Sequence, residues 1–284
     1  MVHFLTTIVI VVVALLFLVS PLVGRDAPLN PEVLNARAER VRPLLEETLK
    51  RFEKRTFFTE KGAAIPYRFF EPENREKDKV YPLVVYLHGS GGRGSDNIKQ
   101  VSGGNIWGAR IWLLPENQKK FPSFVIAPQS SITDFEWSKE ELTALKTLLD
   151  QIIQKLNIDK NRIYVTGQSM GGYGTWLILT TYPEFFAAGV PVCGGGQPGE
   201  AGSIVKNNVG IWAFHGGNDP AVPVEKSREM IEAIKEAGGK PLYTEYPGVG
   251  HASYKGAYTE KGLLPWLFAQ KRTVSVDNGK EPNK

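Results

Sequence analysis

A serine in a glycine-rich junction is the first residue of this sequence that could do chemistry. Ser169 lies in RIYVTGQSMGGYGTWL (residues 162–177), where a β-branched run gives way to a helical pattern, and Gly167 and Gly171 flank it at G-x-S-x-G spacing. A serine on such a tight strand-to-helix turn projects its hydroxyl above the sheet, and the glycines let neighbouring backbone pass closely. We predict that Ser169 is a nucleophile. The alternative is a serine that only caps the following helix.

A serine hydroxyl is a poor nucleophile near neutral pH unless a base removes its proton. His251 is the best candidate for that base, because it follows the last predicted strand in a glycine-flanked loop. Asp219 follows the preceding strand and can orient the imidazole and stabilise its cation. Glu225 is a fallback for the acid, but it lies inside the next predicted helix and is less well placed.

Two backbone N–H groups are predicted to complete this site. Acyl transfer passes through a tetrahedral oxyanion, and N–H groups aimed at that oxygen lower the barrier. One donor is the N–H of Met170, directly after the serine, and the other is the N–H of Ser90 in the HGSGG stretch. We assign structural roles to His88, which begins that stretch, and to His215.

These residues all follow predicted strands, and the carboxyl ends of parallel strands meet at one edge of a sheet. Continuous apolar runs predict strands buried on both faces, and amphipathic runs between them predict covering helices. The predicted strands are 81–89, 123–129, 162–167, 187–194, 209–216 and 241–248, and the predicted helices are 139–157, 174–183 and 224–239. Two short strands around the Lys61-Gly62 turn precede them. The alternation predicts an α/β fold with a mostly parallel sheet.

The ends of the chain differ from this body. Residues 4–24, FLTTIVIVVVALLFLVSPLVG, carry no charge, which is typical of a secretory signal peptide with Gly24 as a cleavage position. Their length and the absence of Lys or Arg before them leave an uncleaved membrane anchor as the alternative. Either segment predicts a secreted, periplasmic or outward-facing protein. We expect residues 1–24 to be this signal or anchor, 25–55 a helical extension interrupted at Pro43, 56–270 one α/β domain, and 271–284 a polar disordered tail.

Composition argues against several other classes of function. The 284 residues include 34 basic and 30 acidic side chains, for a net charge of +4, and no stretch concentrates Lys and Arg among aromatic residues. We therefore predict no nucleic-acid partner. The one cysteine, Cys193, permits no cysteine-rich zinc site, and we predict that it is a small buried residue. The four histidines are scattered without metal-ligand spacing. No metal and no cofactor are predicted, and the oligomeric state is left open.

Two side chains are candidates for contact with a substrate. Gln168 directly precedes the serine, and Trp137 lies in a polar loop downstream of a strand's carboxyl end. Other aromatic residues near the predicted site are expected in the core, because aromatic side chains dominate ordinary cores. These are Trp107, Trp112, Tyr173 and Trp176.

The sequence resembles the α/β-hydrolase superfamily over roughly residues 81–268. The resemblance is carried in order by YPLVVYLHGSGGRGSDN, FVIAPQ, IDKNRIYVTGQSMGGYGTWLILTTYPEFFAAGVPVCGGG, WAFHGGNDPAVPVEKSREMIEAIKEAGG and YPGVGHASY. It is similar in particular to secreted esterases described as predicted peptidases, phospholipase/carboxylesterase-like or poly(hydroxybutyrate) depolymerase-like proteins, which are relatives of feruloyl and acetylxylan esterases. The resemblance implies an α/β-hydrolase fold with helices on both faces of the sheet. It also implies a cofactor-free serine hydrolase with Ser169, Asp219 and His251 as its triad.

Together the residues and the resemblance predict an exported serine hydrolase that cleaves carboxylic esters through an acyl-enzyme. Its substrates are small-molecule or polymer-linked esters, carbohydrate-linked esters among them. Two alternatives stay open: a serine peptidase of the prolyl-oligopeptidase type and a non-catalytic surface binding protein on the same fold. No propeller domain is recognisable, which favours esters over peptides, and no lid insertion is obvious, which predicts an open site.

Overall fold

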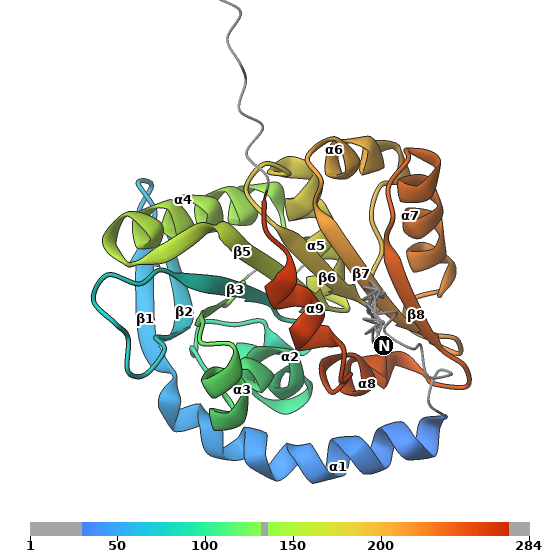
Figure 1. The fold of residues 1–284 in the computed structure, drawn as a ribbon, viewed down its shortest axis with the longest axis horizontal. Coiled ribbons are helices and arrows are strands. Elements are labelled where there is room, and N and C mark those ends of the chain that lie inside the picture. The colour runs from blue at the N-terminus through green and yellow to red at the C-terminus, as the bar shows by residue number, and fades with distance from the viewer. Residues whose placement is uncertain (1–29, 132–135, 273–284) are drawn as a thin grey trace, which may run out of the picture.

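The apolar runs predicted as strands form the centre of an eight-stranded sheet. The structure is a computed structural model, and it describes residues 30–131 and 136–272 (Figure 1). The strands lie in the order β1-β2-β4-β3-β5-β6-β7-β8. Six neighbouring strands, from β4 to β8 in that order, are parallel, and β1 and β2 add antiparallel at one edge. The strand bounds are β1 Glu53–Phe58, β2 Ala64–Phe70, β3 Tyr81–Leu87, β4 Phe124–Pro128, β5 Ile158–Gln168, β6 Ala188–Val192, β7 Gly210–Gly216 and β8 Leu242–Tyr246.

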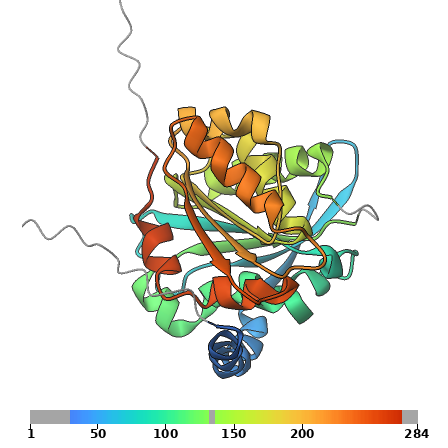
Figure 2. The same ribbon diagram turned by 90° about the vertical axis from the view of Figure 1, so that its right-hand side faces the viewer.

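Helices cover both faces of this sheet (Figures 1 and 2). One face carries α4 (Lys139–Lys155), α5 (Met170–Thr181), α6 (Ala201–Lys206) and α7 (Glu225–Glu236). The other carries α1 (Pro31–Glu47), α2 (Ile106–Arg110), α3 (Pro115–Lys120), α8 (Tyr254–Tyr258) and α9 (Leu263–Ala269). The predicted fold class, an α/β fold with a mostly parallel sheet between two layers of helices, is confirmed.

The central strand β3 shows why the run had to be apolar throughout. All seven of its residues are buried. Leu83, Val85 and Leu87 join the core under α4 and α5, whereas Val84 and Tyr86 join the core on the opposite face. Successive side chains of a strand point to opposite faces, so a strand covered on both sides needs apolar residues at every position.

The amphipathic run before β5 forms α4 with a capping box. The Ser138 side chain accepts a hydrogen bond from the backbone N–H of Glu141, and the Glu141 side chain accepts one from the N–H of Ser138. This reciprocal pair satisfies two N–H groups that the helix start would otherwise leave unbonded. The helix therefore begins at Lys139, two residues after Trp137.

The N-terminal extension differs from prediction in two respects. Helix α1 runs without interruption through Pro43. Proline removes the donor that Glu39 would have bonded, but both residues lie on the exposed face, where water can bond the freed carbonyl. The helical segment also ends earlier than residue 55, because Glu53–Phe58 pairs with Ala64–Phe70 as strand β1. Helix α1 packs against α2 and α8.

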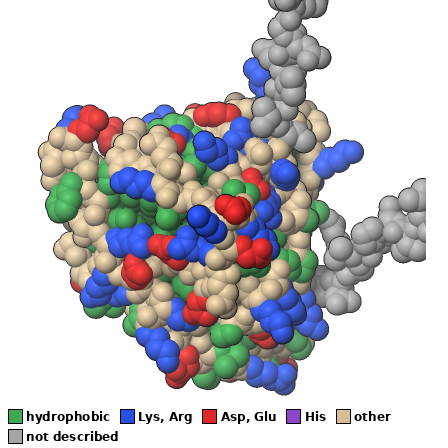
Figure 3. All heavy atoms as spheres, turned by 60° about the vertical axis from the view of Figure 1, so that its left-hand side comes forward, with side chains coloured by type: hydrophobic (Ala, Val, Ile, Leu, Met, Phe, Trp, Pro, Cys, Tyr) green, Lys and Arg blue, Asp and Glu red, His purple; other side chains and the backbone are tan. Residues whose placement is uncertain are grey.

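The segment predicted as a signal peptide or membrane anchor, residues 1–24, lies outside the described residues, as does most of the predicted tail. Among the residues that the structure describes, no helix is long and apolar enough to cross a bilayer. Figure 3 shows a face on which basic and acidic side chains lie next to one another rather than in a field of one sign.

Candidate active site

The turn between β5 and α5 holds Ser169 in an unusual backbone conformation. Ser169 has φ +55° and ψ −119°, a region that costs energy for any residue with a side chain. The neighbouring backbone is packed too closely for side chains: a methyl group on Gly171 would overlap the carbonyl oxygen of Leu87, and one on Gly167 would overlap that of Gly171. The glycines around the serine are therefore required by the approach of β3 and α5 to this turn.

Three of the predicted site residues meet in one hydrogen-bonded array. Ser169 Oγ lies 2.9 Å from His251 Nε2, and His251 Nδ1 lies 2.7 Å from Asp219 Oδ2. A carboxylate accepts at Nδ1, so that nitrogen carries the ring proton and Nε2 is left to accept from the serine hydroxyl. The three residues follow β5, β7 and β8, whose carboxyl ends bring them together.

The surroundings of Asp219 hold its carboxylate in place. Its side chain is fully buried, and Oδ1 accepts hydrogen bonds from the N–H groups of Ala221 at 2.8 Å and Val222 at 3.0 Å. With that oxygen occupied, Oδ2 faces the imidazole of His251. The fallback acid Glu225 instead lies exposed at the start of α7, in an ion pair with Arg228.

The two N–H groups predicted as oxyanion donors border the same serine. Neither the N–H of Met170 nor that of Ser90 has a hydrogen-bond partner among the residues described. Met170 begins α5, and Ser90 follows Gly89 in the loop after β3. Both groups are therefore able to donate to a bound ligand, as the proposed chemistry requires.

His88 is buried beneath that loop and holds it. Its Nε2 accepts a hydrogen bond from the N–H of Ser130 at 2.9 Å, so the ring proton is on Nδ1, which donates to the carbonyl of Gly89 at 2.8 Å. Burial lowers the pKa of His88 to about 4, which keeps the ring neutral. The structural role predicted for this histidine agrees with its place in the structure.

Trp137 was a candidate for contact with a substrate, but it does not line the pocket beside Ser169. Trp137 is 2% exposed, its ring lies tilted at 4.9 Å from the His88 ring, and its Nε1 donates to the His88 carbonyl at 3.2 Å. The ring packs against Gly174 of α5. These contacts show that Trp137 supports the loop after β3 and does not line the pocket beside Ser169.

A pocket of about 360 Å³ opens beside Ser169 and His251. Gln168, the other candidate for substrate contact, lines it, and its buried side chain donates from Nε2 to the carbonyl of Gly104 at 3.0 Å. The sequence led to no prediction for the opposite wall, although the glycine-rich stretch SGGN at 102–105 is a signal that could have indicated it. The pocket residues not predicted from the sequence are Lys99, Ser102, Gly103, Gly104, Asn105 and Tyr254.

The other histidine and the other aromatic residues considered in the sequence lie in or at the edge of the protein interior. His215 is buried between Val222 O at 3.0 Å and Ser227 Oγ at 2.7 Å, and burial lowers its pKa. Trp107, Trp112 and Trp176 are buried in the cores, and Tyr173 is half-buried.

One group of potential metal ligands lies together within the described part of the chain. The ligand atoms of Cys193, Asp219 and His251 are within 4.8 Å of one another. Cys193 is fully buried, and burial raises the pKa of its thiol to about 12, which opposes the thiolate that a metal would need. Two members of the group already bond each other, so the donor set does not fit a resident metal.

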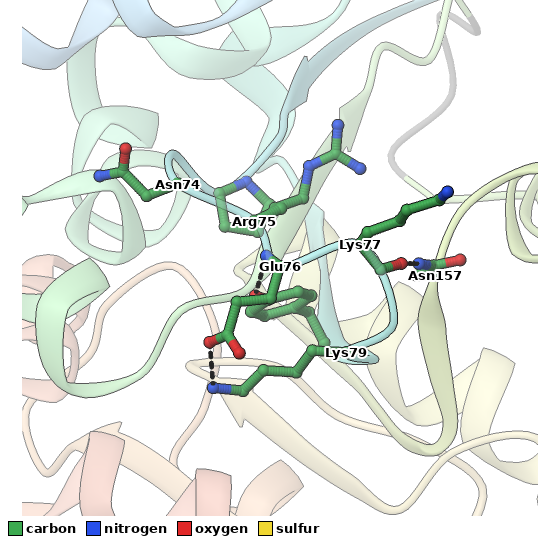
Figure 4. Close-up of a pocket in the computed structure, with 8 residues that line it drawn as sticks. Asn74, Arg75, Glu76, Lys77, Lys79 and Asn157 are labelled. Carbon is green, nitrogen blue, oxygen red and sulfur yellow. Dashed lines mark hydrogen bonds and ion pairs between the residues drawn. The ribbon is translucent and has the colours of Figure 1, made fainter.

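A second hollow, of about 460 Å³, lies at the opposite ends of the strands (Figure 4). It is bordered by Tyr81 at the start of β3 and by Asn157, which directly precedes β5. Two of its basic side chains form ion pairs: Lys79 bonds Glu76 at 3.1 Å, and Arg75 pairs with Glu71, which lies outside the lining. Nothing in this hollow resembles the array at Ser169.

Comparison with known proteins finds esterases and other hydrolases among the proteins similar to this chain. A model of the prolyl oligopeptidase family matches residues 130–196, which include Ser169. An uncharacterized secreted protein of Arthroderma benhamiae is 27% identical over 241 residues, 71% of this chain and 25% of that protein. A probable feruloyl esterase C of Aspergillus niger is 26% identical over 188 residues, 65% of this chain and 66% of that protein. The crystal structure of a thermostable esterase superposes with a TM-score of 0.75 at 39% identity, covering 80% of this chain and 64% of that one.

The chain thus spans between a quarter and about two thirds of the length of these relatives. The sheet order, the turn that holds Ser169 and these similarities place the chain in the α/β-hydrolase superfamily.

Proposed function

We propose that the protein is a serine hydrolase that cleaves carboxylic esters through an acyl-enzyme. The observation that carries this proposal is the continuous array from Ser169 Oγ through His251 to Asp219, with contacts of 2.9 and 2.7 Å. A non-catalytic binding protein on this fold has no need of a base, an orienting carboxylate and a strained serine at three separate strand ends.

The chemistry follows from the position of each group. His251 Nε2 takes the hydroxyl proton as Ser169 attacks the ester carbonyl, and Asp219 stabilises the imidazolium that forms. The N–H groups of Met170 and Ser90 stabilise the negative oxygen of the tetrahedral intermediate. His251 then protonates the leaving alcohol, and water releases the acid from Ser169 by the same route in reverse.

Esters are favoured over amides as substrates. Two of the similar proteins are described as esterases, which supports ester substrates. The second candidate is a peptidase, and the match to the prolyl oligopeptidase family over residues 130–196 favours it, because the same array can cleave an amide.

Export is part of the proposal. It is supported by the uncharged apolar segment at residues 4–24 and by the similar protein described as secreted. Expression of the full chain followed by fractionation and N-terminal sequencing tests it. A mature protein beginning after the apolar segment indicates a cleaved signal, retention in the membrane after a high-salt wash indicates an anchor, and an intact chain in the cytoplasm contradicts export.

Labelling with a fluorophosphonate tests the activated serine. We expect wild type to label, Ser169→Ala and His251→Ala not to label, and Ser203→Ala, which changes a serine on α6, to label like wild type. Hydrolysis of p-nitrophenyl esters should fall by at least about 10⁴-fold in the first two variants. Turnover of aminoacyl p-nitroanilides in preference to esters would favour the peptidase, and an unlabelled wild type would favour the binding protein.

A further inference from the structure

One short segment of the pocket wall contacts both loops that carry the proposed oxyanion donors. We call residues 102–105 the clamp segment. On one side, Asn105 Oδ1 accepts a hydrogen bond from the N–H of Gly89, the residue before Ser90, at 2.9 Å. On the other side, the carbonyl of Gly104 accepts from Nε2 of Gln168, the residue before Ser169, at 3.0 Å. The clamp segment therefore ties together two loops that are about 80 residues apart in the sequence.

The side chain of Asn105 is the central member of this segment. It is 4% exposed and lines the pocket beside Ser169. Its Oδ1 also accepts from the hydroxyl of Tyr86 at 3.1 Å, and its Nδ2 donates to the carbonyl of Lys99 at 3.2 Å. A backbone N–H can only donate and a backbone carbonyl can only accept, so these partners fix which end of the amide faces Gly89.

The geometry of the peptide bond connects Asn105 to the Ser90 N–H. The carbonyl of Gly89 and the N–H of Ser90 belong to one planar trans peptide and point in opposite directions. His88 Nδ1 and the N–H of Gly92 both hold that carbonyl, at 2.8 Å each. Asn105 holds the other side of Gly89, its own N–H. Since glycine is otherwise free to rotate about φ and ψ, holding both of its polar groups fixes the direction of the Ser90 N–H.

The clamp segment is itself anchored from behind. The buried guanidinium of Arg110 donates to Ser102 Oγ at 3.4 Å and to the carbonyl of Leu45, near the end of α1, at 3.3 Å. The N-terminal extension thereby supports the pocket wall, and the wall supports the loop after β3.

We propose that Asn105 is a positioning residue for the oxyanion hole: by holding the Gly89 N–H, it aims the N–H of Ser90 at the developing oxyanion. This inference rests on the proposed function. Oxyanion stabilisation acts on the transition state, so loss of Asn105 should lower kcat and the affinity for a transition-state analogue while changing KM little.

The test measures kcat, KM and the Ki of an alkylboronic acid, whose tetrahedral serine adduct mimics the intermediate. Asn105→Leu removes the acceptor and keeps the number and branching of the side-chain heavy atoms, and Asn105→Ala serves if the leucine variant does not fold. We expect kcat and boronate affinity to fall together by about ten- to a hundredfold, with KM changing less than about threefold.

Two control variants separate an effect on the position of the Ser90 N–H from a loss of protein stability. Tyr86→Phe removes the other donor to the same Oδ1 and leaves the Gly89 bond, so boronate affinity should stay near the wild-type value. Gln118→Ala removes a buried amide that accepts from Ser123 N–H at 3.2 Å and donates to Trp112 O at 2.9 Å, away from the pocket. It should lower the Tm and leave kcat unchanged.

The outcomes distinguish this inference from the proposed function. A wild type that neither labels nor hydrolyses esters contradicts the proposed function. An active wild type with Asn105 variants that bind the boronate equally tightly, or that lose Tm without a selective loss of kcat, overturns the role of Asn105.

Discussion

Lowering the pH is expected to destabilise the fold through His88. The ring is fully buried, and its Nε2 accepts a hydrogen bond from the N–H of Ser130 at 2.9 Å. A proton on Nε2 would place two donors face to face and a charge in the core. Burial accordingly lowers the pKa of His88 from 6.5 to about 4.

The size of this destabilisation follows from the linkage between proton binding at His88 and folding. Between pH 6.5 and pH 4 the unfolded chain binds a proton at His88 and the folded chain does not, so the free energy of unfolding falls as the pH falls. At about 1.4 kcal/mol per pKa unit, this interval corresponds to roughly 3 kcal/mol. The contribution is fully present above pH 6.5 and is lost as the pH reaches 4.

Urea unfolding of wild type and His88→Gln at a series of pH values from 4 to 7.5 measures this contribution. Glutamine does not titrate, and His215, whose pKa burial also lowers, is present in both proteins. The wild-type free energy of unfolding should therefore decline relative to the variant by roughly 3 kcal/mol across the interval. Parallel curves for the two proteins would refute the reasoning.

Two further predictions concern the array and the turn that presents it. Asp219→Asn should fold normally and lower kcat on p-nitrophenyl esters by on the order of 10³–10⁴-fold, because an amide no longer holds His251 in the required tautomer; a loss below tenfold would contradict this role. Gly171→Ala should lose folded, labelling-competent protein, because the added methyl meets the Leu87 carbonyl. Gly202→Ala on α6, where a methyl meets nothing within 4 Å, should fold and label like wild type; equal behaviour of the two alanine variants would show that the close approach is unimportant.

The features that the sequence predicted correctly depend on residues close together in the chain or on the order of the strands. The continuous apolar run of β3 is a direct consequence of burial on both faces. The spacing of glycines around Ser169 reflects a turn that only small residues allow. Placing Asp219 and His251 beside the serine required only that they follow neighbouring parallel strands.

Where the sequence misled, the outcome depended on whether the folded protein buries or exposes the residue. Trp137 stands in a polar stretch, and only its packing on His88 and Gly174 turns it inward. Pro43 was expected to interrupt the first helix, but the exposed position of the turn tolerates it.

The sequence by itself determined the α/β-hydrolase fold, the serine turn and the order of the candidate array, because these depend on strand periodicity, glycine spacing and chain order. Only the tertiary structure decided which residues hold the loops around Ser169 in place. The contact of Asn105 with Gly89 and the tautomer of His88 each join segments that no local pattern relates. Hydrogen bonds of this kind form only after the sheet has brought the loops together, so their partners leave no periodic signal in the sequence.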